Sequence, residues 1–247
     1  MNEQKFSGKA DNYDKYRPSY PDELLQWLSE RAGKRTVDIG AGTGKFTACL
    51  VRHGFDVTAV EPNTDMLEKL HKNHPDISAV QASAEDTGLP AHSFQLVTAA
   101  QAFHWFDKQR FRDECQRLLT DDGRLAVVWN ERSKDGFEAE RDSICMKYCG
   151  AFHSGHVFTG YDRSDGDGDS FLRNEYFAVV EYFSQDYLVP MSREAYIGDI
   201  LSRSYALSEG DEHYAAFISE LNGVFDRFQK NGFVTAKYKS TCYLGKF

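Results

Sequence analysis

The sequence predicts a doubly wound α/β fold with a mostly parallel sheet, and three observations support this prediction. Short apolar runs rich in β-branched residues alternate with segments of helical periodicity from residue 21 to residue 130. The first of these runs ends in a glycine-rich loop, at the place where such a sheet binds ligands. The chain has 247 residues, 41% of them hydrophobic, so it can bury the core of one large domain.

The regular part of the chain is an alternation of strands and helices. The expected strands cover residues 35–40, 55–62, 77–83, 94–100 and 124–130. The expected helices cover residues 21–31, 43–53, 63–72 and 108–119. Pro21 opens the first helix and Gly54 ends the second. Asn63 or Thr64 caps the third helix, and a turn at residues 121–123 precedes the last of these strands.

The order becomes less regular beyond residue 130. Helices are expected over residues 138–152, 193–205 and 211–229, and strands over residues 177–189 and 235–245. The polar, glycine-rich residues 161–170 predict a loop. We expect the last two strands to extend the open edge of the sheet, which makes the C-terminal part a helical insertion within a single domain over residues 1–247.

Charge and composition narrow the class of partner. The formal net charge is 29 − 38 = −9, without a basic block, so nucleic acid is a weak candidate. No apolar run approaches the roughly 20 residues that a membrane helix needs. The five cysteines are odd in number and scattered, which is typical of reduced thiols. We therefore expect a cytoplasmic protein with no membrane partner and a small-molecule substrate; the sequence does not predict the oligomeric state.

The glycine-rich loop at residues 40–44 is the strongest functional signal. Glycine lets the backbone approach a ligand closely, and the helix that follows presents free N–H groups. Glu61 ends the second strand, 21 residues after Gly40. A carboxylate at that place can accept hydrogen bonds from both hydroxyls of a ribose. The loop and Glu61 together indicate a nucleoside cofactor.

Three cofactor classes compete for this loop. A dinucleotide site needs a third glycine where Lys45 stands, and lysine hinders both the pyrophosphate and the packing of helix on strand. A P-loop needs Ser or Thr after the lysine, where Phe46 stands, and a longer glycine spacing. S-adenosylmethionine (SAM) needs neither feature, because its amino-acid end is small. A glycine turn without any ligand is the remaining alternative.

Several segments in this order resemble the motifs of the class I SAM-dependent methyltransferases. They are residues 38–44, 61–63, 83–86 with 89–90, 99–107 and 118–132, together with the N-terminal segment YDKYRPSYP. The combination is similar to the subgroup around the trans-aconitate methyltransferases and related small-molecule enzymes. The resemblance is strong over residues 5–132 and weak beyond. It implies a seven-stranded Rossmann-like sheet with an antiparallel last strand, in which residues 1–132 bind the cofactor and residues 133–247 supply substrate-side elements and closing strands.

The resemblance also implies which residues hold SAM. Glu61 is expected at the ribose, Pro62 and Met66 at the adenine face, and Ser83, Ala84 and Glu85 at the adenine edge. The family often has Asp where Ser83 stands, so that contact departs from the pattern. The residues expected at the methionine end and the loop are Tyr16, Arg17, Asp38, Gly40, Ala41, Gly42, Ala100, Gln101 and Ala102. Tyr13 is expected to fold over the cofactor with Tyr16 and Arg17, and Arg17 could pair with the carboxylate of the cofactor. A solvated charge is the alternative for Arg17.

Aromatic residues that follow the fourth strand are expected near the transferred methyl group. Phe103 and Trp105 are predicted to line the substrate pocket, and His104 is the candidate general base. A packing role for His104 is the alternative. A carboxylate acceptor would need no base, but it would need a cation.

Residues farther along the chain are the candidates for the rest of the substrate pocket. Arg132 and Arg203 could supply the cation that a carboxylate acceptor needs, and a surface charge is the alternative for each. The aromatic residues that could close the pocket are Tyr205, Phe152, Phe158 and Tyr161.

Two further clusters suggest metals but fit them poorly. Cys145, Cys149 and His153 step by four along one helix, with His156 beyond, and residues stacked in this way do not converge easily on a tetrahedral ion. The alternating aspartates at residues 165–169 lack the glycine and glutamate of a calcium loop. We therefore expect no metal site.

The sequence predicts an enzyme that transfers a methyl group from SAM to a carboxylate, phenol or amine of a small molecule. The alternatives are a methyltransferase for a protein or RNA and a SAM- or nucleoside-binding module without turnover. A nicotinamide-dependent oxidoreductase is disfavoured by Lys45.

Overall fold

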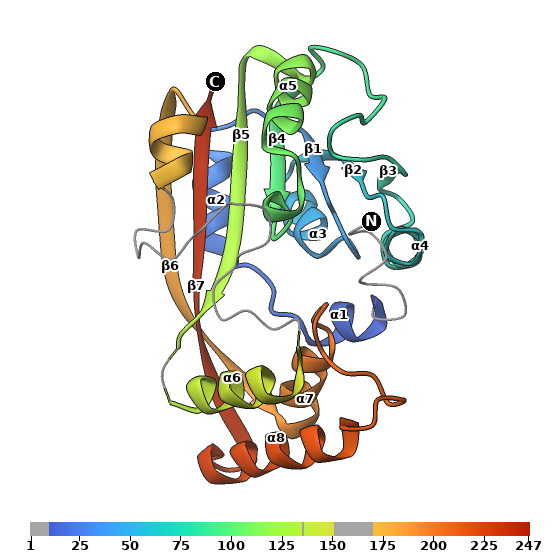
Figure 1. The fold of residues 1–247 in the computed structure, drawn as a ribbon. Coiled ribbons are helices and arrows are strands. Elements are labelled where there is room, and N and C mark those ends of the chain that lie inside the picture. Colours follow the sequence, from blue (N-terminus) through green and yellow to red (C-terminus); the bar gives the residue numbers. More distant parts are fainter. Residues whose placement is uncertain (1–9, 135, 151–169) are drawn as a thin grey trace.

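The computed structural model describes residues 10–134, 136–150 and 170–247 (Figure 1). Its strands are β1 (Arg35–Ile39), β2 (Asp56–Val60), β3 (Ser78–Val80), β4 (Phe94–Ala100), β5 (Leu119–Arg132), β6 (Val179–Ser192) and β7 (Phe233–Lys246). Its helices are α1 (Ala10–Tyr16), α2 (Asp22–Ser29), α3 (Lys45–Arg52), α4 (Thr64–Asn73), α5 (Lys108–Leu118), α6 (Phe137–Tyr148), α7 (Arg193–Leu201) and α8 (Tyr214–Phe228). Two single-turn helices, η2 (Phe103–Trp105) and η3 (Leu172–Tyr176), complete the described elements.

The strands form one seven-stranded sheet in the order β3-β2-β1-β4-β5-β7-β6. Neighbouring strands from β3 to β5 pair in parallel, whereas β7 runs antiparallel to both β5 and β6. The chain reverses its direction of progress across the sheet between β1 and β4, which is where a doubly wound fold binds its ligand. The predicted α/β fold with an antiparallel last strand is confirmed.

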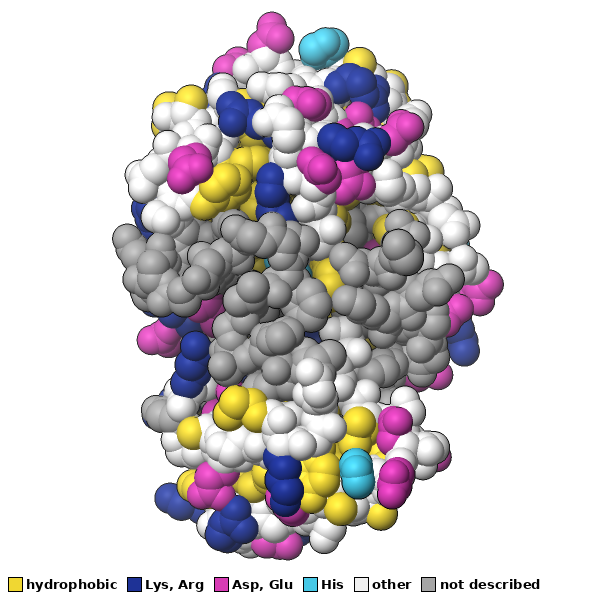
Figure 2. All heavy atoms as spheres, viewed as in Figure 1, with side chains coloured by type: hydrophobic (Ala, Val, Ile, Leu, Met, Phe, Trp, Pro, Cys, Tyr) yellow, Lys and Arg dark blue, Asp and Glu magenta, His cyan; other side chains and the backbone are white. Residues whose placement is uncertain are grey.

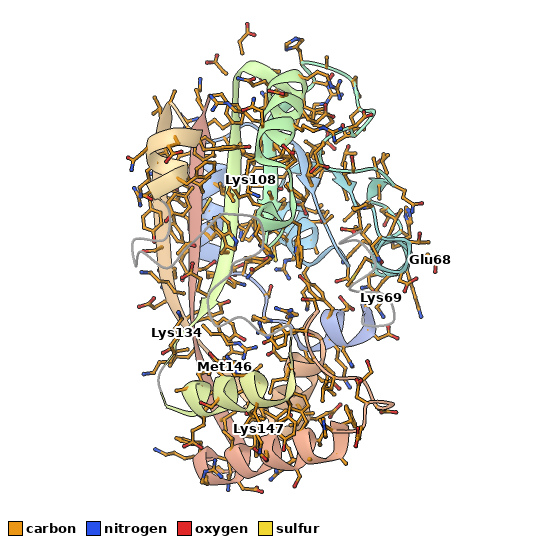
Figure 3. The ribbon with its side chains drawn as sticks, in the orientation of Figure 1. Glu68, Lys69, Lys108, Lys134, Met146 and Lys147 are labelled. Atoms are coloured by element: carbon orange, nitrogen blue, oxygen red, sulfur yellow. The ribbon has the colours of Figure 1, made fainter. Side chains whose placement is uncertain are left out.

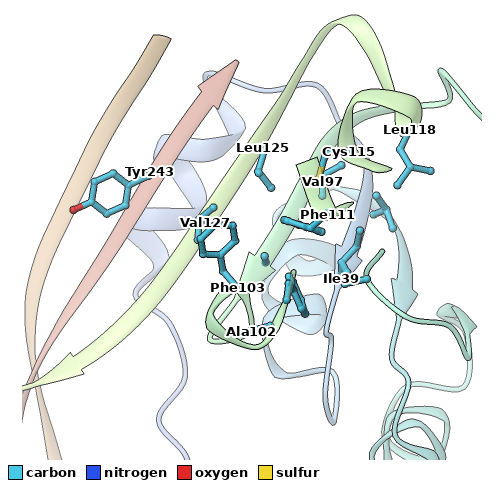
Figure 4. Packing of buried hydrophobic residues seen from close by; sticks show 14 of the residues in the cluster. Ile39, Val97, Ala102, Phe103, Phe111, Cys115, Leu118, Leu125, Val127 and Tyr243 are labelled. Atoms are coloured by element: carbon cyan, nitrogen blue, oxygen red, sulfur yellow. The ribbon is translucent and has the colours of Figure 1, made fainter. Parts of the chain in front are cut away.

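Both faces of the sheet are covered, and β5 shows how the sequence achieves this. Its residues point alternately to opposite faces. Leu125, Val127 and Trp129 pack with α5 and Phe103 in one cluster (Figure 4), while Ala126 and Val128 pack with α2 and α3 in another. A strand buried on both sides must be apolar throughout, which explains the uninterrupted apolar run in this strand.

The last three strands are much longer than the first three. Strands β5, β6 and β7 each have 14 residues, against five for β1 and β2. Figure 1 shows that they continue past the sheet core to the helical insertion, which consists of α6, α7 and α8. A third hydrophobic cluster lies there, and Val234, Ala236 and Tyr238 of β7 join it. The insertion therefore has its own core, anchored on the extended strands.

Helix α1 connects the helical insertion with the cofactor side of the sheet. Lys69 of α4, labelled in Figure 3, pairs with Asp11 at 2.7 Å. Lys15 and the hydroxyl of Tyr16 both reach Glu194 of α7, at 2.6 and 2.7 Å. No helix is predicted from the sequence over residues 10–16, because this segment has no buried apolar stripe.

Most predicted elements agree with the structure, and the differences are local. Of the two predicted caps, Asn63 and Thr64, Asn63 caps α4: its side chain accepts a hydrogen bond from the Met66 N–H at 3.0 Å. The turn predicted at residues 121–123 is wrong: these residues belong to β5, whose pairing with β4 jumps from Leu119 to Arg124. The helix predicted over residues 138–152 ends at Tyr148, and residues 151–152 lie outside the described part.

Two surface properties bear on possible partners. Among the described residues, no helix is both long and apolar enough to cross a membrane. On the face shown in Figure 2, described basic and acidic side chains are interspersed, and no broad patch of one charge forms there.

Candidate active site

The loop after β1 has a backbone conformation that requires glycine. Gly40 and Gly42 have φ angles of 71° and 58°, in the region that other residues rarely adopt. A Cβ added to Gly40 would lie 2.6 Å from the Cβ of Ala102 at the end of β4. Gly40 therefore allows the loop and the end of β4 to approach each other closely.

A buried carboxylate connects the strands behind this loop. Asp38 is 1% exposed and accepts hydrogen bonds from the hydroxyls of Thr47 and Thr98, both at 2.6 Å. Burial raises the pKa of Asp38 to about 6, although these two hydrogen bonds act to lower it. Asp38 thus ties β1 to α3 and β4, and it does not line the cavity described below.

Glu61, just after β2, is held by the backbone on both sides. One carboxylate oxygen accepts a hydrogen bond from the Gly42 N–H at 2.8 Å, and the other accepts one from the Asn63 N–H at 2.9 Å. The side chain is 7% exposed, so its orientation is fixed while one side of it meets the cavity. Each carboxylate oxygen can accept more than one hydrogen bond, which leaves acceptor capacity for ligand hydroxyls.

A cavity of about 260 Å³ lies where the carboxyl ends of β1, β2 and β4 meet. This volume is near the lower end of the roughly 300–1,000 Å³ typical of small-molecule sites. The lining consists of glycines, small residues, two acids and several aromatic rings: Tyr13, Gly40, Gly42, Glu61, Pro62, Asn63, Met66, Ser83, Ala84, Glu85, Ala100, Gln101, Ala102, Trp105 and Phe106. Most of the residues expected at SAM from the sequence are therefore brought together here.

Gln101 has an unusual position in this wall. Its φ angle is 56°, which is uncommon for a residue other than glycine. Its side-chain amide donates a hydrogen bond to the Asn130 carbonyl at 2.8 Å, so β5 holds this conformation in place. Strained residues of this kind often lie at functional sites.

Some residues expected at the cofactor lie elsewhere. Ala41 does not line the cavity, and neither does Tyr16, whose ring occupies the space next to Gly198 of α7. Arg17 lies in a second, smaller cavity. Tyr16 and Arg17 are directed toward the helical insertion because α1 presents Tyr13, not Tyr16, to the cofactor side.

The residues expected in the substrate pocket are dispersed. Trp105 lines the cavity, but Phe103 is fully buried in the core, so its predicted contact with substrate is wrong (Figure 4). Arg132 is buried and pairs with Asp199 and, at 3.3 Å, with Glu138. Neither cavity includes Arg132, and its charge is used within the protein instead.

The remaining predicted residues lie near the cavity or outside the described part. His104 does not line the cavity. The centre of its ring lies 4.9 Å from the ring centre of Trp105, and Trp105 does line the cavity. Tyr205 packs on the core of the helical insertion. The aromatic residues Phe152, Phe158 and Tyr161 lie outside the described residues.

Asn63, predicted only as a possible helix cap, also lines the cavity. Its N–H positions Glu61, and its side chain caps α4 at the cavity wall. In the sequence, the signal for a role of Asn63 at the site is its position directly after Glu61 and Pro62, at the start of a helix.

Of the candidate metal ligands, only Cys145 and Cys149 belong to the described residues. No group of three His, Cys, Asp or Glu side chains that could hold a metal ion occurs among the described residues. His153, His156 and the aspartates at 165, 167 and 169 lie outside those residues. Cys145 and Cys149 are buried free thiols, and their mutual hydrogen bond, together with burial, raises the pKa of Cys145.

Comparison with known proteins agrees with this geometry. The methyltransferase domain family matches residues 37–127, which include most of β1 and all of β2, β3 and β4. The uncharacterized methyltransferase Rv3342 of Mycobacterium tuberculosis is 34% identical over 206 residues, which cover 82% of this chain and 78% of that protein.

Solved structures show the same architecture. A protein of Anaeromyxobacter dehalogenans assigned as a type II methyltransferase superposes with a TM-score of 0.68 and 26% identity over 94% of this chain and 98% of that one. The YcgJ protein of Bacillus subtilis shares the fold, with a TM-score of 0.51 and 18% identity over 92% of this chain and 100% of that one. The chain belongs to the class I SAM-dependent methyltransferase family.

Proposed function

We propose that the cavity binds SAM and that the protein transfers its methyl group to a small-molecule acceptor. The observation that carries this proposal is Glu61, fixed by the Gly42 and Asn63 N–H groups at the cavity wall. A buried carboxylate held in one orientation suits a pair of ribose hydroxyls. The glycines beside it leave room for a ligand to approach the backbone.

The other lining residues fit the remaining parts of SAM. Met66 and Pro62 offer an apolar surface for adenine, and Glu85 offers a carboxylate near its edge. The Glu85 carboxylate is held by the Asp107 N–H at 2.9 Å. Ala100, Gln101 and Ala102 lie at the end of β4, where the methionine portion would be held.

When bound, SAM supplies an electrophilic methyl group on a sulfonium, so the protein mainly has to align the acceptor and exclude water. The aromatic rings of Trp105, Phe106 and Tyr13 also line the cavity. Electron-rich rings favour a nearby cation and exclude water from its surroundings. These rings are therefore suited to orienting the sulfonium.

A small-molecule acceptor is favoured over RNA by charge. The chain carries a net charge of −9, and the charged residues that line the cavity are the acids Glu61 and Glu85. A large RNA substrate would require a basic face. A transfer assay distinguishes this enzyme from the alternative, a SAM-binding module without turnover.

The test is a transfer assay with SAM labelled at its methyl group and a panel of small acids, phenols and amines, with total protein and RNA as further acceptors. The proposal predicts label in one small-molecule class. Label confined to protein or RNA would contradict the small-molecule acceptor. SAM binding without transfer to any acceptor would identify a binding module.

His104 is proposed as the general base if the acceptor found in this assay has a proton to lose. His104→Ala is then expected to lower turnover by about a hundredfold, because general bases contribute on the order of 10²–10⁴. SAM affinity should not change, since His104 is not part of the cavity lining. Unchanged turnover, or an unaltered pH profile near neutrality, would assign His104 to packing against Trp105.

A further inference from the structure

A second cavity adjoins the first one. Tyr13 and Gln101 line both, so the two spaces meet at these residues. The second cavity has a volume of about 30 Å³. This is roughly the 30 Å³ that one water molecule occupies in the liquid, so it can hold a single small group such as a carboxylate.

The two cavities differ in the sign of their charged residues. The charged side chains that line the first cavity are Glu61 and Glu85. Those that line the second are Arg17, Lys45 and Arg203. In a poorly solvated space, such a set of cations favours an anionic group.

Arg203 already has a carboxylate partner. It pairs with Asp199 at 3.3 Å, one turn earlier in the chain. Asp199 also pairs with Arg132, which pairs in turn with Glu138. Arg203 therefore belongs to a buried network in which cations and carboxylates alternate.

Arg17 has no such partner among the described residues. No ion pair between described residues includes Arg17. Its Nε donates a hydrogen bond to the uncharged hydroxyl of Ser202 at 2.8 Å. Its guanidinium lies 5.0 Å from the centre of the Tyr13 ring. Burial and the repulsion from Arg203 lower the pKa of Arg17 to about 10. A cation in this setting is stabilised when an anion enters.

Lys45 adds a second cation to the same wall. It begins helix α3 and is partly buried, and burial lowers the pKa of its amine. Asp14 attracts this amine electrostatically. Asn130 also lines the cavity, but its side-chain N–H donates to the Ser19 carbonyl at 3.2 Å. The attraction for an anion therefore comes from the cationic side chains.

We propose that the second cavity anchors the methyl acceptor by binding one of its carboxylates. This inference rests on the proposed function, because it takes the adjoining cavity as the SAM site. SAM carries a net positive charge and suits the acidic lining, whereas an anionic acceptor suits the basic lining. The arrangement brings a cationic donor and an anionic acceptor together at Tyr13 and Gln101.

SAM has a carboxylate of its own, so the first arm of the test concerns the cofactor. S-adenosylhomocysteine and 5′-methylthioadenosine, which lacks the amino-acid end, are titrated calorimetrically into wild type, Arg17→Gln and the control Arg35→Gln. Arg35 is exposed at the opposite end of β1. We expect less than a threefold change for both ligands in Arg17→Gln. A loss of more than tenfold for S-adenosylhomocysteine alone would place the cofactor carboxylate in this cavity and overturn the proposal.

The second arm uses carboxylates directly. Succinate, citrate and benzoate, with succinamide and benzamide as neutral controls, are added to the S-adenosylhomocysteine complex, and thermal unfolding is measured. We expect at least one carboxylate to raise the Tm of wild type and Arg35→Gln but not of Arg17→Gln, with part of the effect retained in Arg17→Lys. No effect of any carboxylate on wild type, or an equal effect in Arg17→Gln, would overturn the proposal.

The two proposals fail in different ways. If wild type binds no S-adenosylhomocysteine, the proposed function fails. If it binds that ligand but responds to no carboxylate, only the anchoring inference fails.

Discussion

The two adjoining cavities are built in different ways, although they share Tyr13 and Gln101. The first cavity lies at the carboxyl ends of parallel strands that are neighbours in the sheet. Much of its lining comes from short sequence motifs. The second is formed by residues that are far apart in the chain, such as Arg17, Lys45 and Arg203. They meet only because α1 packs against α7 and the long strands carry the helical insertion beside the sheet.

This difference suggests how such a protein can keep its cofactor site while its acceptor site changes. The cofactor site depends on backbone geometry, as at Gly40 and Glu61, and few residue types satisfy it. The second cavity depends on individual side chains held by long-range packing. Three predictions test this contrast, in order of expected effect.

The largest effect is expected where the helical insertion joins β5. Arg132→Met should lower the free energy of unfolding by about 3 kcal/mol, the lower end of the cost of breaking a buried ion pair. Asp199 and Glu138 lose the cation that they share, but each keeps a second arginine, Arg203 and Arg141. Denaturant unfolding measures this change.

The control for this variant is an exposed ion pair of the same insertion. Arg227→Met removes the partner of Glu140, and both side chains are largely exposed. A loss of less than about 1 kcal/mol is expected there. Similar small losses in both variants would show that the buried network does not hold the insertion on the sheet.

The second prediction concerns Asp38 behind the glycine loop. Burial raises its pKa to about 6 in the folded state, above its ordinary value near 4. Its protonated form is therefore favoured by folding, and this contribution to stability is present at acid pH and lost as the pH rises through about 6. The free energy of unfolding of wild type minus that of Asp38→Asn should fall by about 2 kcal/mol from pH 4 to pH 7.5.

Asp56→Asn provides the control for this pH dependence, since Asp56 is exposed at the start of the neighbouring strand. Its difference from wild type should stay constant over the same range. A flat difference for Asp38→Asn as well would show that Asp38 is charged without cost in the folded protein.

The third prediction concerns the cofactor cavity itself. Glu61→Ala should weaken SAM binding by about 1–3 kcal/mol, because one charged hydrogen-bonding partner is lost. Glu68→Ala, on the exposed face of α4 (Figure 3), should leave the affinity unchanged. Thermal unfolding is measured in parallel, since Glu61 also accepts two backbone hydrogen bonds. Equal SAM affinities for wild type and Glu61→Ala would remove Glu61 from the site.

The sequence predicted the parallel half of the fold well because its signals are local. Periodicity and glycine positions located β1, β2 and β4 together with the loop at Gly40 and the cap at Asn63. The order of the strands and the antiparallel last strand came from the resemblance to a family. Helix α1 was missed because its contacts are polar and lie on α4 and α7, far along the chain.

The candidate site was predictable to a similar degree. Residues that line the cavity through a motif, such as Glu61 and Met66, could be named from the sequence. Phe103 and Arg132 could not be assigned correctly, since periodicity does not show which neighbour turns into the core or which charge finds a buried partner. Such facts depend on packing between distant segments.

The most direct test of the account is calorimetric titration of the wild-type protein with SAM, S-adenosylhomocysteine and NAD. The account predicts that SAM and S-adenosylhomocysteine each bind at one site per chain and that NAD does not bind, since Lys45 stands where a dinucleotide site needs glycine. Binding of NAD without binding of SAM would contradict it.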